Sequence, residues 1–115
     1  MTARAVTVPD GRTIIDPLHV PTDARARMRG LLGRDSLDDN EGMWLRRCRM
    51  VHTFGMRFAI DLVYLNADNE VCKIVEEVRP GRISACLGAE SVIELNRGAA
   101  RRLGLRAGVC LSIRD

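Results

Sequence analysis

Aromatic side chains are scarce in this chain of 115 residues, where they make up only 3% of the sequence. The core must therefore be aliphatic, and a hydrophobic fraction of 46% is enough to form one without disulfides or a structural metal. Surfaces that bind single-stranded nucleic acid stack successive bases on aromatic rings. The scarcity of such rings argues against that kind of surface.

Lysine is scarcer still, because Lys73 is the only lysine among 18 basic residues. With 15 acidic residues the net charge is +3, which is smaller and more mixed than a dedicated nucleic-acid binder needs. Arginine binds planar anions such as carboxylate and phosphate through two parallel hydrogen bonds. We therefore expect a small anionic ligand as partner rather than a nucleic acid, although a genome rich in G and C would produce the same arginine bias.

Several motifs that would identify a cofactor or an enzyme class are missing. The four cysteines form no CxxC pair, and there is no P-loop, nucleophile elbow, HExxH motif or dinucleotide fingerprint. We therefore predict no cofactor and no metal. The first residues contain no apolar signal-peptide core, and no segment is long enough to span a membrane. We expect a cytoplasmic protein with reduced thiols and no membrane contact.

The spacing of apolar residues predicts mainly strands. Runs 4–8 and 12–16 flank Asp10-Gly11 and predict a hairpin, and runs 59–65 and 71–78 predict a second one. Further strands are expected at 43–45, 92–95 and 110–113. A loop is expected at Pro17 and Pro21.

Two helices are predicted. An amphipathic helix is expected over residues 22–33, with Thr22 as its N-cap and Gly30 in its interior. A short helix is expected from Ala99 to Leu103, with Gly104 as a left-handed C-cap. Together these elements predict a single α+β domain over residues 1–115. Its small sheet should be mostly antiparallel and partly closed like a barrel, without a parallel βαβ unit.

The most informative segment is 52–57, which reads HTFGMR. A histidine beside a hydroxyl and an arginine binds an anion or transfers a proton near neutral pH. The predicted binding site for a small anionic ligand contains His52, Thr53, Met56, Arg57, Asp61 and, from the predicted helix, Arg29.

A structural role is the alternative for the same segment. His52 and Thr53 would then satisfy buried backbone groups, while Phe54 and Met56 would belong to the core. His19 lies in a loop bounded by prolines and is interpreted as incidental.

Two carboxylates, Asp61 and Glu94, stand in strands that are otherwise apolar. A buried carboxylate needs a partner, and Arg57 or Arg29 would provide one. Asp61 would then either tie the helix to the sheet or orient His52 within the binding site. We favour the structural role for both carboxylates.

The cysteines allow a redox interpretation. Cys48 stands between two arginines, whose charge would lower its thiol pKa. It precedes His52 by four residues. If Cys48 and Cys86 converge near His52, they form a candidate redox pair. Two cysteines and one histidine are an incomplete metal set, so the metal alternative is not adopted.

The remaining thiols are simpler to interpret. Cys72 and Cys110 lie in apolar strand segments and are interpreted as inert core residues. Small unpaired side chains are also the simplest interpretation of Cys48 and Cys86.

Several motifs occur in an order that resembles a known family. The chain has RGLLGR at 29–34, Gly42-Met43, HTFGMR at 52–57, Ile60-Asp61 and, near its end, VIEL at 92–95, Gly98, Leu103–Leu105 and Gly108. Over residues 25–113 this order resembles the domain-of-unknown-function family number 192, in its branch with an HTFGMRF segment.

The resemblance implies a small mixed fold and no particular activity, because the family has none assigned. Members of the HTFGMRF branch often carry cysteine at the positions of Cys48 and Cys86, and many relatives have an export signal. The family's usual aspartate after Gly108 is replaced here by Val109.

Three functions follow from these observations. We prefer a non-catalytic binding or accessory domain for a small anionic ligand held at residues 52–57. The second is a small hydrolase or lyase with His52 as general base and Asp61 as its orienting group. The third is a nucleic-acid-contacting module that uses Arg46, Arg47 and Arg49.

Overall fold

The computed structural model describes residues 1–7, 10–23, 26 and 29–115. Within these ranges no helix is long and apolar enough to cross a membrane. The regular elements are β1 (Thr2–Thr7), β2 (Thr13–His19), β3 (Gly42–Arg46), β4 (Met50–His52), β5 (Ile60–Leu65), β6 (Val71–Val78), β7 (Ile83–Ala85), β8 (Ser91–Asn96), α2 (Ala99–Arg102) and β9 (Leu111–Arg114).

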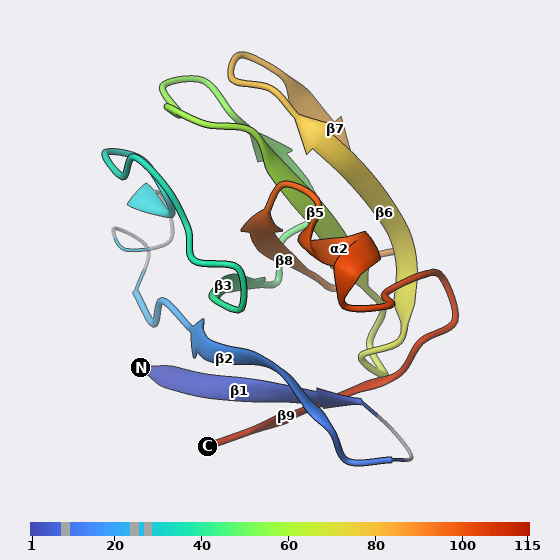
Figure 1. The fold of residues 1–115 in the computed structure, drawn as a ribbon. Helices are drawn as coiled ribbons and strands as arrows, with labels where there is room; N and C mark the ends of the chain where they lie inside the picture. The colour runs from blue at the N-terminus through green and yellow to red at the C-terminus, as the bar shows by residue number, and fades with distance from the viewer. Residues whose placement is uncertain (8–9, 24–25, 27–28) are drawn as a thin grey trace.

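Seven of these strands form one mixed sheet in the order β6-β5-β8-β3-β2-β1-β9 (Figure 1). Its neighbouring strands are antiparallel except β2 and β3, which pair in parallel through Leu18 with Gly42 and His19 with Met43. Strands β4 and β7 form a separate antiparallel pair. The prediction of a mostly antiparallel α+β fold is confirmed, whereas the β4–β7 pair was not predicted.

In the described part of the chain the large sheet does not close into a barrel, so the predicted barrel-like closure is not confirmed. The edge strands β6 and β9 approach each other at one end only. There Glu70 and Cys110 form an isolated antiparallel β-bridge, and the amide of Val71 donates to the carbonyl of Val109. Strands β1 and β9 pair antiparallel, so the two chain termini lie side by side (Figure 1).

Both predicted hairpins are present, as β1–β2 and β5–β6. In the second, the side-chain oxygen of Asn66 accepts hydrogen bonds from the amides of Asp68 and Glu70, which is how asparagine stabilises a turn. The prediction of a loop at Pro17 is wrong, because β2 continues through Pro17 to His19.

The short predicted helix is confirmed as α2. Gly98 precedes it, and Gly104 follows with a φ of +74°, a conformation that glycine adopts without strain. The amide of Leu105 then donates to the carbonyl of Ala100 at 2.9 Å, as in a C-cap that turns the chain back on the helix.

The longer predicted helix is not confirmed, because residues 24–25 and 27–28 lie outside the described residues. Asp23, rather than Thr22, accepts a hydrogen bond from the amide of Ala26 at 2.7 Å. Gly30 has a φ of +48°, so its predicted place in a helix interior is wrong. Leu31 follows Gly30 and is buried.

The large sheet separates two apolar clusters, because successive side chains of a strand point to opposite faces. On β5, Val63 and Leu65 face one cluster, which also contains Ala99 and Ala100 of α2. Ile60, Leu62 and Tyr64 face the other cluster. This second cluster also contains Leu31, Leu45, Val51, Met56 and Val92.

Asp61 is fully buried on the α2 side of β5. Its two oxygens accept hydrogen bonds from the amide of Glu77 at 2.9 Å and the amide of Ala100 at 3.0 Å. Glu77 lies in a bulge of β6, and Ala100 lies in the first turn of α2, so neither amide has a regular partner. Asp61 therefore ties β6 and α2 to β5 through backbone amides, and the predicted arginine partner is wrong.

Replacing Asp61 with alanine should lower the free energy of unfolding by about 3 kcal/mol, because two buried amides lose their acceptor. Urea denaturation followed by circular dichroism measures the change. The exposed Asp68 offers a matched control, and Asp68→Ala should change the free energy by about 0.5 kcal/mol or less. Equal effects of the two substitutions would contradict the structural role of Asp61.

Candidate functional site

A small pocket lies on the side of the sheet that faces away from α2. It has a volume of about 190 Å³, which is room for about six water molecules at roughly 30 Å³ each. Residues 29–32 and 50–56 meet there above β3 and β8. Its apolar lining comes from Leu31, Leu32, Leu45, Met50, Val51 and Met56, and its polar lining from Arg29, Cys48, His52 and Glu94.

Glu94 supplies the buried polar group of this pocket. It lies in β8 between Met43 of β3 and Leu62 of β5, and its side chain is only 5% exposed. Its Oε1 atom is fully buried and has no hydrogen-bond partner among the described residues. Burial raises the pKa of Glu94 to about 7, because an apolar environment disfavours the charged form.

Glu94 is the residue whose importance the sequence did not reveal. Its position in an apolar strand was visible, but the same is true of Asp61, and a structural partner was expected for both. The structure distinguishes them, because Asp61 has two backbone donors whereas Glu94 Oε1 has no donor in the described part of the chain. They point to opposite faces of the sheet, so Asp61 is not placed to orient His52, and that predicted role is wrong.

His52 ends β4 and is exposed at the pocket. Its ring centroid lies 5.7 Å from that of Phe54, and the side chain of Phe54 is 53% exposed. The alternative in which His52 satisfies buried groups and Phe54 belongs to the core is therefore wrong for these two residues. Met56 is buried and lines the pocket, so it is at once a core residue and part of the candidate site.

Thr53 has the structural role that was the alternative prediction for this residue. Its buried hydroxyl donates to the carbonyl of Arg79 at 2.6 Å and accepts from the amide of Arg82 at 2.8 Å. Its own amide donates to the carbonyl of Arg82. These bonds join the segment 52–57 to the connection between β6 and β7, and Thr53 does not line the pocket.

Arg57 does not line the pocket either. Its Nη1 atom lies 2.9 Å from Oδ1 of Asp35, in an ion pair whose side chains are 60% and 82% exposed. Of the predicted ligand-binding residues, the structure thus brings Arg29, His52 and Met56 together around one pocket. A ligand-binding role for Thr53, Arg57 and Asp61 has no geometric support.

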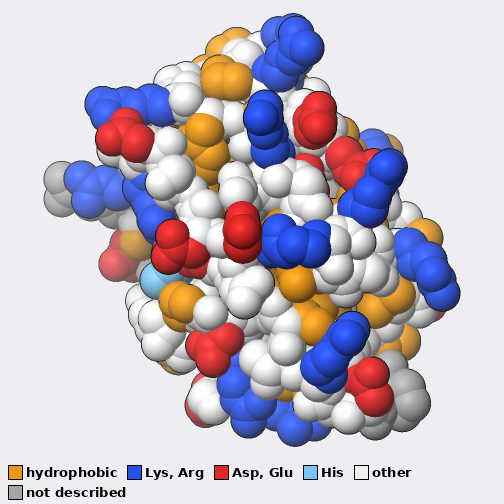
Figure 2. Space-filling model, viewed as in Figure 1, with side chains coloured by type: hydrophobic (Ala, Val, Ile, Leu, Met, Phe, Trp, Pro, Cys, Tyr) orange, Lys and Arg blue, Asp and Glu red, His pale blue; other side chains and the backbone are white. Residues whose placement is uncertain are grey.

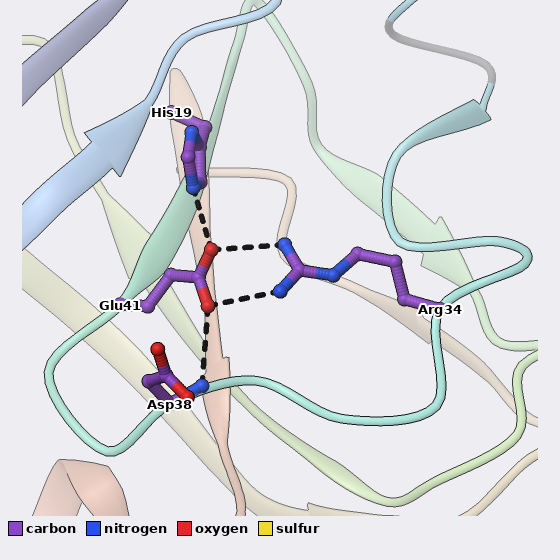
Figure 3. Close-up of polar contacts among 4 residues, drawn as sticks. All are labelled: His19, Arg34, Asp38 and Glu41. Carbon is purple, nitrogen blue, oxygen red and sulfur yellow. Dashed lines mark hydrogen bonds and ion pairs between the residues drawn. The ribbon is translucent and has the colours of Figure 1, made fainter.

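A cluster of charges centred on Glu41 fixes the chain that follows the pocket wall (Figure 3). Both oxygens of Glu41 accept from the guanidinium of Arg34 at 2.9 Å, in a bidentate pair. The Nε2 atom of His19 lies 2.6 Å from Oε2, and the amide of Asp38 donates to Oε1 at 3.1 Å. The pair with Arg34 is the main cause that lowers the pKa of Glu41 to about 2.

This cluster has a positional consequence for the pocket. Arg34 follows residues 29–32 directly, whereas Glu41 precedes β3 and His19 ends β2. The contacts therefore hold one wall of the pocket against the sheet. The interpretation of His19 as incidental is wrong. The sequence signal for this cluster was a pair of opposite charges beside two motifs. Arg34 ends RGLLGR, and Glu41 directly precedes Gly42-Met43.

The thiols are arranged differently from the predicted pairing. Cys86 Sγ lies 3.9 Å from Cys72 Sγ, while Cys48 lines the pocket and donates its S–H to the carbonyl of Met50. No disulfide joins the four cysteines. Cys72 and Cys110 are exposed, so the interpretation of these two as core thiols is wrong. A redox pair of Cys48 and Cys86 stays a prediction. Within the described ranges, no group of three or more potential ligands is arranged to hold a metal.

The arginines at 46, 47 and 49 are exposed, but they do not form a simple basic surface. Arg46 stacks 5.5 Å above the ring centroid of Trp44, and Nε of Arg49 donates to the carbonyl of Ala89 at 3.0 Å. On the face drawn in Figure 2, basic and acidic side chains are interspersed. Nucleic-acid contact through these arginines stays a prediction.

Replacing Glu41 with glutamine should destabilise the protein by about 2 kcal/mol at neutral pH, because Arg34 and His19 lose a charged acceptor. The pKa of Glu41 is lowered from 4.5 to about 2, so its contribution is complete above the unfolded-state value and is lost as the pH falls through the folded-state value. Thermal midpoints measured over this acidic range should therefore fall more steeply for the wild type than for Glu41→Gln. The exposed pair of Glu76 and Arg101 provides the control, because Glu76→Gln should leave the slope unchanged. A wild-type slope equal to that of Glu41→Gln would contradict the role of Glu41.

Two solved structures share this fold. A protein of unknown function from Novosphingobium aromaticivorans superposes with a TM-score of 0.83 at 21% identity, covering 96% of this chain and 84% of the other. A protein from Sinorhizobium meliloti, described as a candidate transcription regulator, superposes with a TM-score of 0.82 at 25% identity, covering 98% of this chain and 94% of the other. The comparison with curated proteins finds no match.

The motif order that suggested a family is tested by a family model. The model of DUF192, described as an uncharacterised ACR family, matches residues 6–113. This range includes the RGLLGR, HTFGMR and VIEL segments and begins before the region that the motifs alone covered. The chain therefore belongs to the DUF192 family.

Proposed function

We propose that this DUF192 protein is a non-catalytic binding domain whose small ligand occupies the pocket between residues 29–32 and 50–56. One observation carries the proposal: two motif segments that are distant in sequence converge on the same pocket, with Arg29 and His52 exposed at it. A segment with a purely structural role would direct its polar groups to the backbone, as Thr53 does. Arg29 and His52 instead remain accessible to a ligand.

The lining indicates the chemistry of the ligand. Leucine, valine and methionine side chains form the walls, which favours a short apolar body. The guanidinium of Arg29 is suited to a carboxylate or phosphate oxygen, and the ring of His52 adds a hydrogen-bonding group beside it. A volume of about 190 Å³ suits a small organic acid.

Isothermal titration calorimetry with short-chain carboxylates and phosphate monoesters tests this proposal. Arg29→Ala should weaken binding at least tenfold, because a charge-assisted hydrogen bond contributes about 1.5–3 kcal/mol. Arg57→Ala is the matched control, since Arg57 is an exposed arginine of the HTFGMR motif that pairs with Asp35 outside the pocket. The proposal fails if the whole panel shows no binding, or if the two substitutions have equal effects.

A second function, a small hydrolase or lyase, is supported by the pKa of Glu94. A carboxyl group with a pKa of about 7 in a pocket is suited to general acid–base catalysis near neutral pH. In this version Glu94 replaces Asp61 as the acidic group near His52.

Incubation of the protein with each ligand that it binds, followed by NMR of the small molecule, separates the two functions. Under the preferred function every ligand is recovered unchanged. Under the second, a product forms, and Glu94→Gln slows its formation by a factor of about 100 or more.

The third prediction, nucleic-acid contact, agrees with the description of the Sinorhizobium protein as a candidate transcription regulator. It is less favoured, because Arg46 and Arg49 already contact Trp44 and Ala89.

A further inference from the structure

We propose that Glu94 binds a primary ammonium group at the buried end of the pocket, so that the ligand is a compact amino acid with its acidic group at Arg29 and His52. This inference rests on the proposed function, because it names the second end of the ligand in the same pocket.

The backbone of β8 holds Glu94 inside the sheet, away from solvent. Strand β8 is hydrogen-bonded on both sides, to β3 and to β5, and Glu94 stands opposite Met43 and Leu62. Its Oε1 atom is fully buried, and no described residue forms a hydrogen bond with it. Buried polar atoms in native proteins are nearly always hydrogen-bonded, so an acceptor in this state points to a donor that binds there.

The other polar groups around the pocket do not act as that donor. The hydroxyl of Tyr64 donates to Ser84 Oγ at 2.9 Å, and the thiol of Cys48 donates to the carbonyl of Met50. Arg29 and His52 are exposed, and neither forms an ion pair with Glu94 in the described structure. Burial alone accounts for the raised pKa of Glu94, so no neighbouring positive charge among the described groups offsets it.

A cation fits this acceptor better than a neutral donor does. The interaction between a carboxylate and an ammonium is strongest where water is excluded, and each N–H of the ammonium can donate. A second anionic group would instead be repelled by Glu94. The acidic end of the ligand is therefore directed to Arg29 and His52, and its ammonium end to Glu94.

The size of the pocket selects the probes. A volume of about 190 Å³ corresponds to about six waters, which suits a molecule such as 4-aminobutyrate. Butyrate has the same chain and acidic group without the ammonium, and butylamine has the ammonium without the acid. The three compounds therefore separate the two ends of the site.

The proposal also fixes the sign of a pH dependence. An ammonium group favours the ionised form of Glu94, so binding lowers its pKa and releases a proton from molecules in which Glu94 is protonated. The affinity for 4-aminobutyrate should therefore rise as the pH increases through about 7. The other titratable groups near Glu94 are Arg29, Cys48 and His52, which line the pocket, and Tyr64, which interacts with Glu94 but does not line the pocket.

Calorimetric titration of the full chain at about pH 6 and about pH 8.5 tests the proposal. At the higher pH, 4-aminobutyrate should bind at least tenfold more tightly than butyrate, and the ratio should shrink at the lower pH. Glu94→Gln should abolish the preference and its pH dependence while butyrate still binds. Glu90→Gln changes an exposed carboxylate near the start of the same strand and should leave both unchanged.

An NMR titration of the Glu94 carboxyl carbon in the wild-type chain tests the same inference without a Glu94 variant, so the result does not depend on whether a variant folds. Saturation with 4-aminobutyrate should lower the pKa of Glu94, and saturation with butyrate should not. Equal affinities for 4-aminobutyrate and butyrate, or an unchanged pKa, would overturn this inference and leave the proposed function intact, with water as the partner of Glu94. No binding by any member of the carboxylate and phosphate panel would overturn both.

Discussion

Strands β5 and β8, two neighbours in the interior of the sheet, impose the constraint on which the rest of this structure depends. Because side chains alternate along a strand, each of these strands divides its residues between two apolar clusters, one of which α2 covers. One polar residue of β5, Asp61, faces α2, whereas Glu94 of β8 faces the pocket. The two carboxylates are close in the sheet, yet they meet entirely different surroundings.

That difference separates a structural carboxylate from a functional candidate. Asp61 accepts from the amides of Glu77 and Ala100 and so stabilises a bulge and a helix start. Glu94 lies among apolar side chains, and its raised pKa expresses the energetic cost of ionising it there. Native proteins retain such costs mainly where a site needs them, because an apolar residue of similar size would pack at least as well. The proposed binding function and the proposed ammonium group both follow from this contrast.

Each family motif likewise contains residues with a structural role and residues that line the pocket. In HTFGMR, Thr53 anchors the chain to the β6–β7 connection and Met56 packs in the core, which leaves His52 exposed at the pocket. In RGLLGR, Arg34 holds the chain against Glu41 while Arg29 lines the pocket. A motif therefore contains residues that position the site as well as residues that reach a ligand. Counting every polar member as a ligand contact overestimates the site, as it did for Thr53 and Arg57.

The sequence by itself determined the local elements and the family. Alternating apolar residues, the Asp10-Gly11 and Asn66–Asn69 turns and the glycines around α2 are local signals, so hairpins, strands and the short helix were predictable. It also located the segments that meet at the pocket. Only the tertiary structure decided the parallel β2–β3 contact, the β4–β7 pair, the open sheet and the partners of Asp61, Glu41 and Glu94. These features depend on which strands become neighbours and on which face of the sheet each side chain lies. A carboxylate in an apolar run looks the same in sequence whether the fold gives it two amide donors or none.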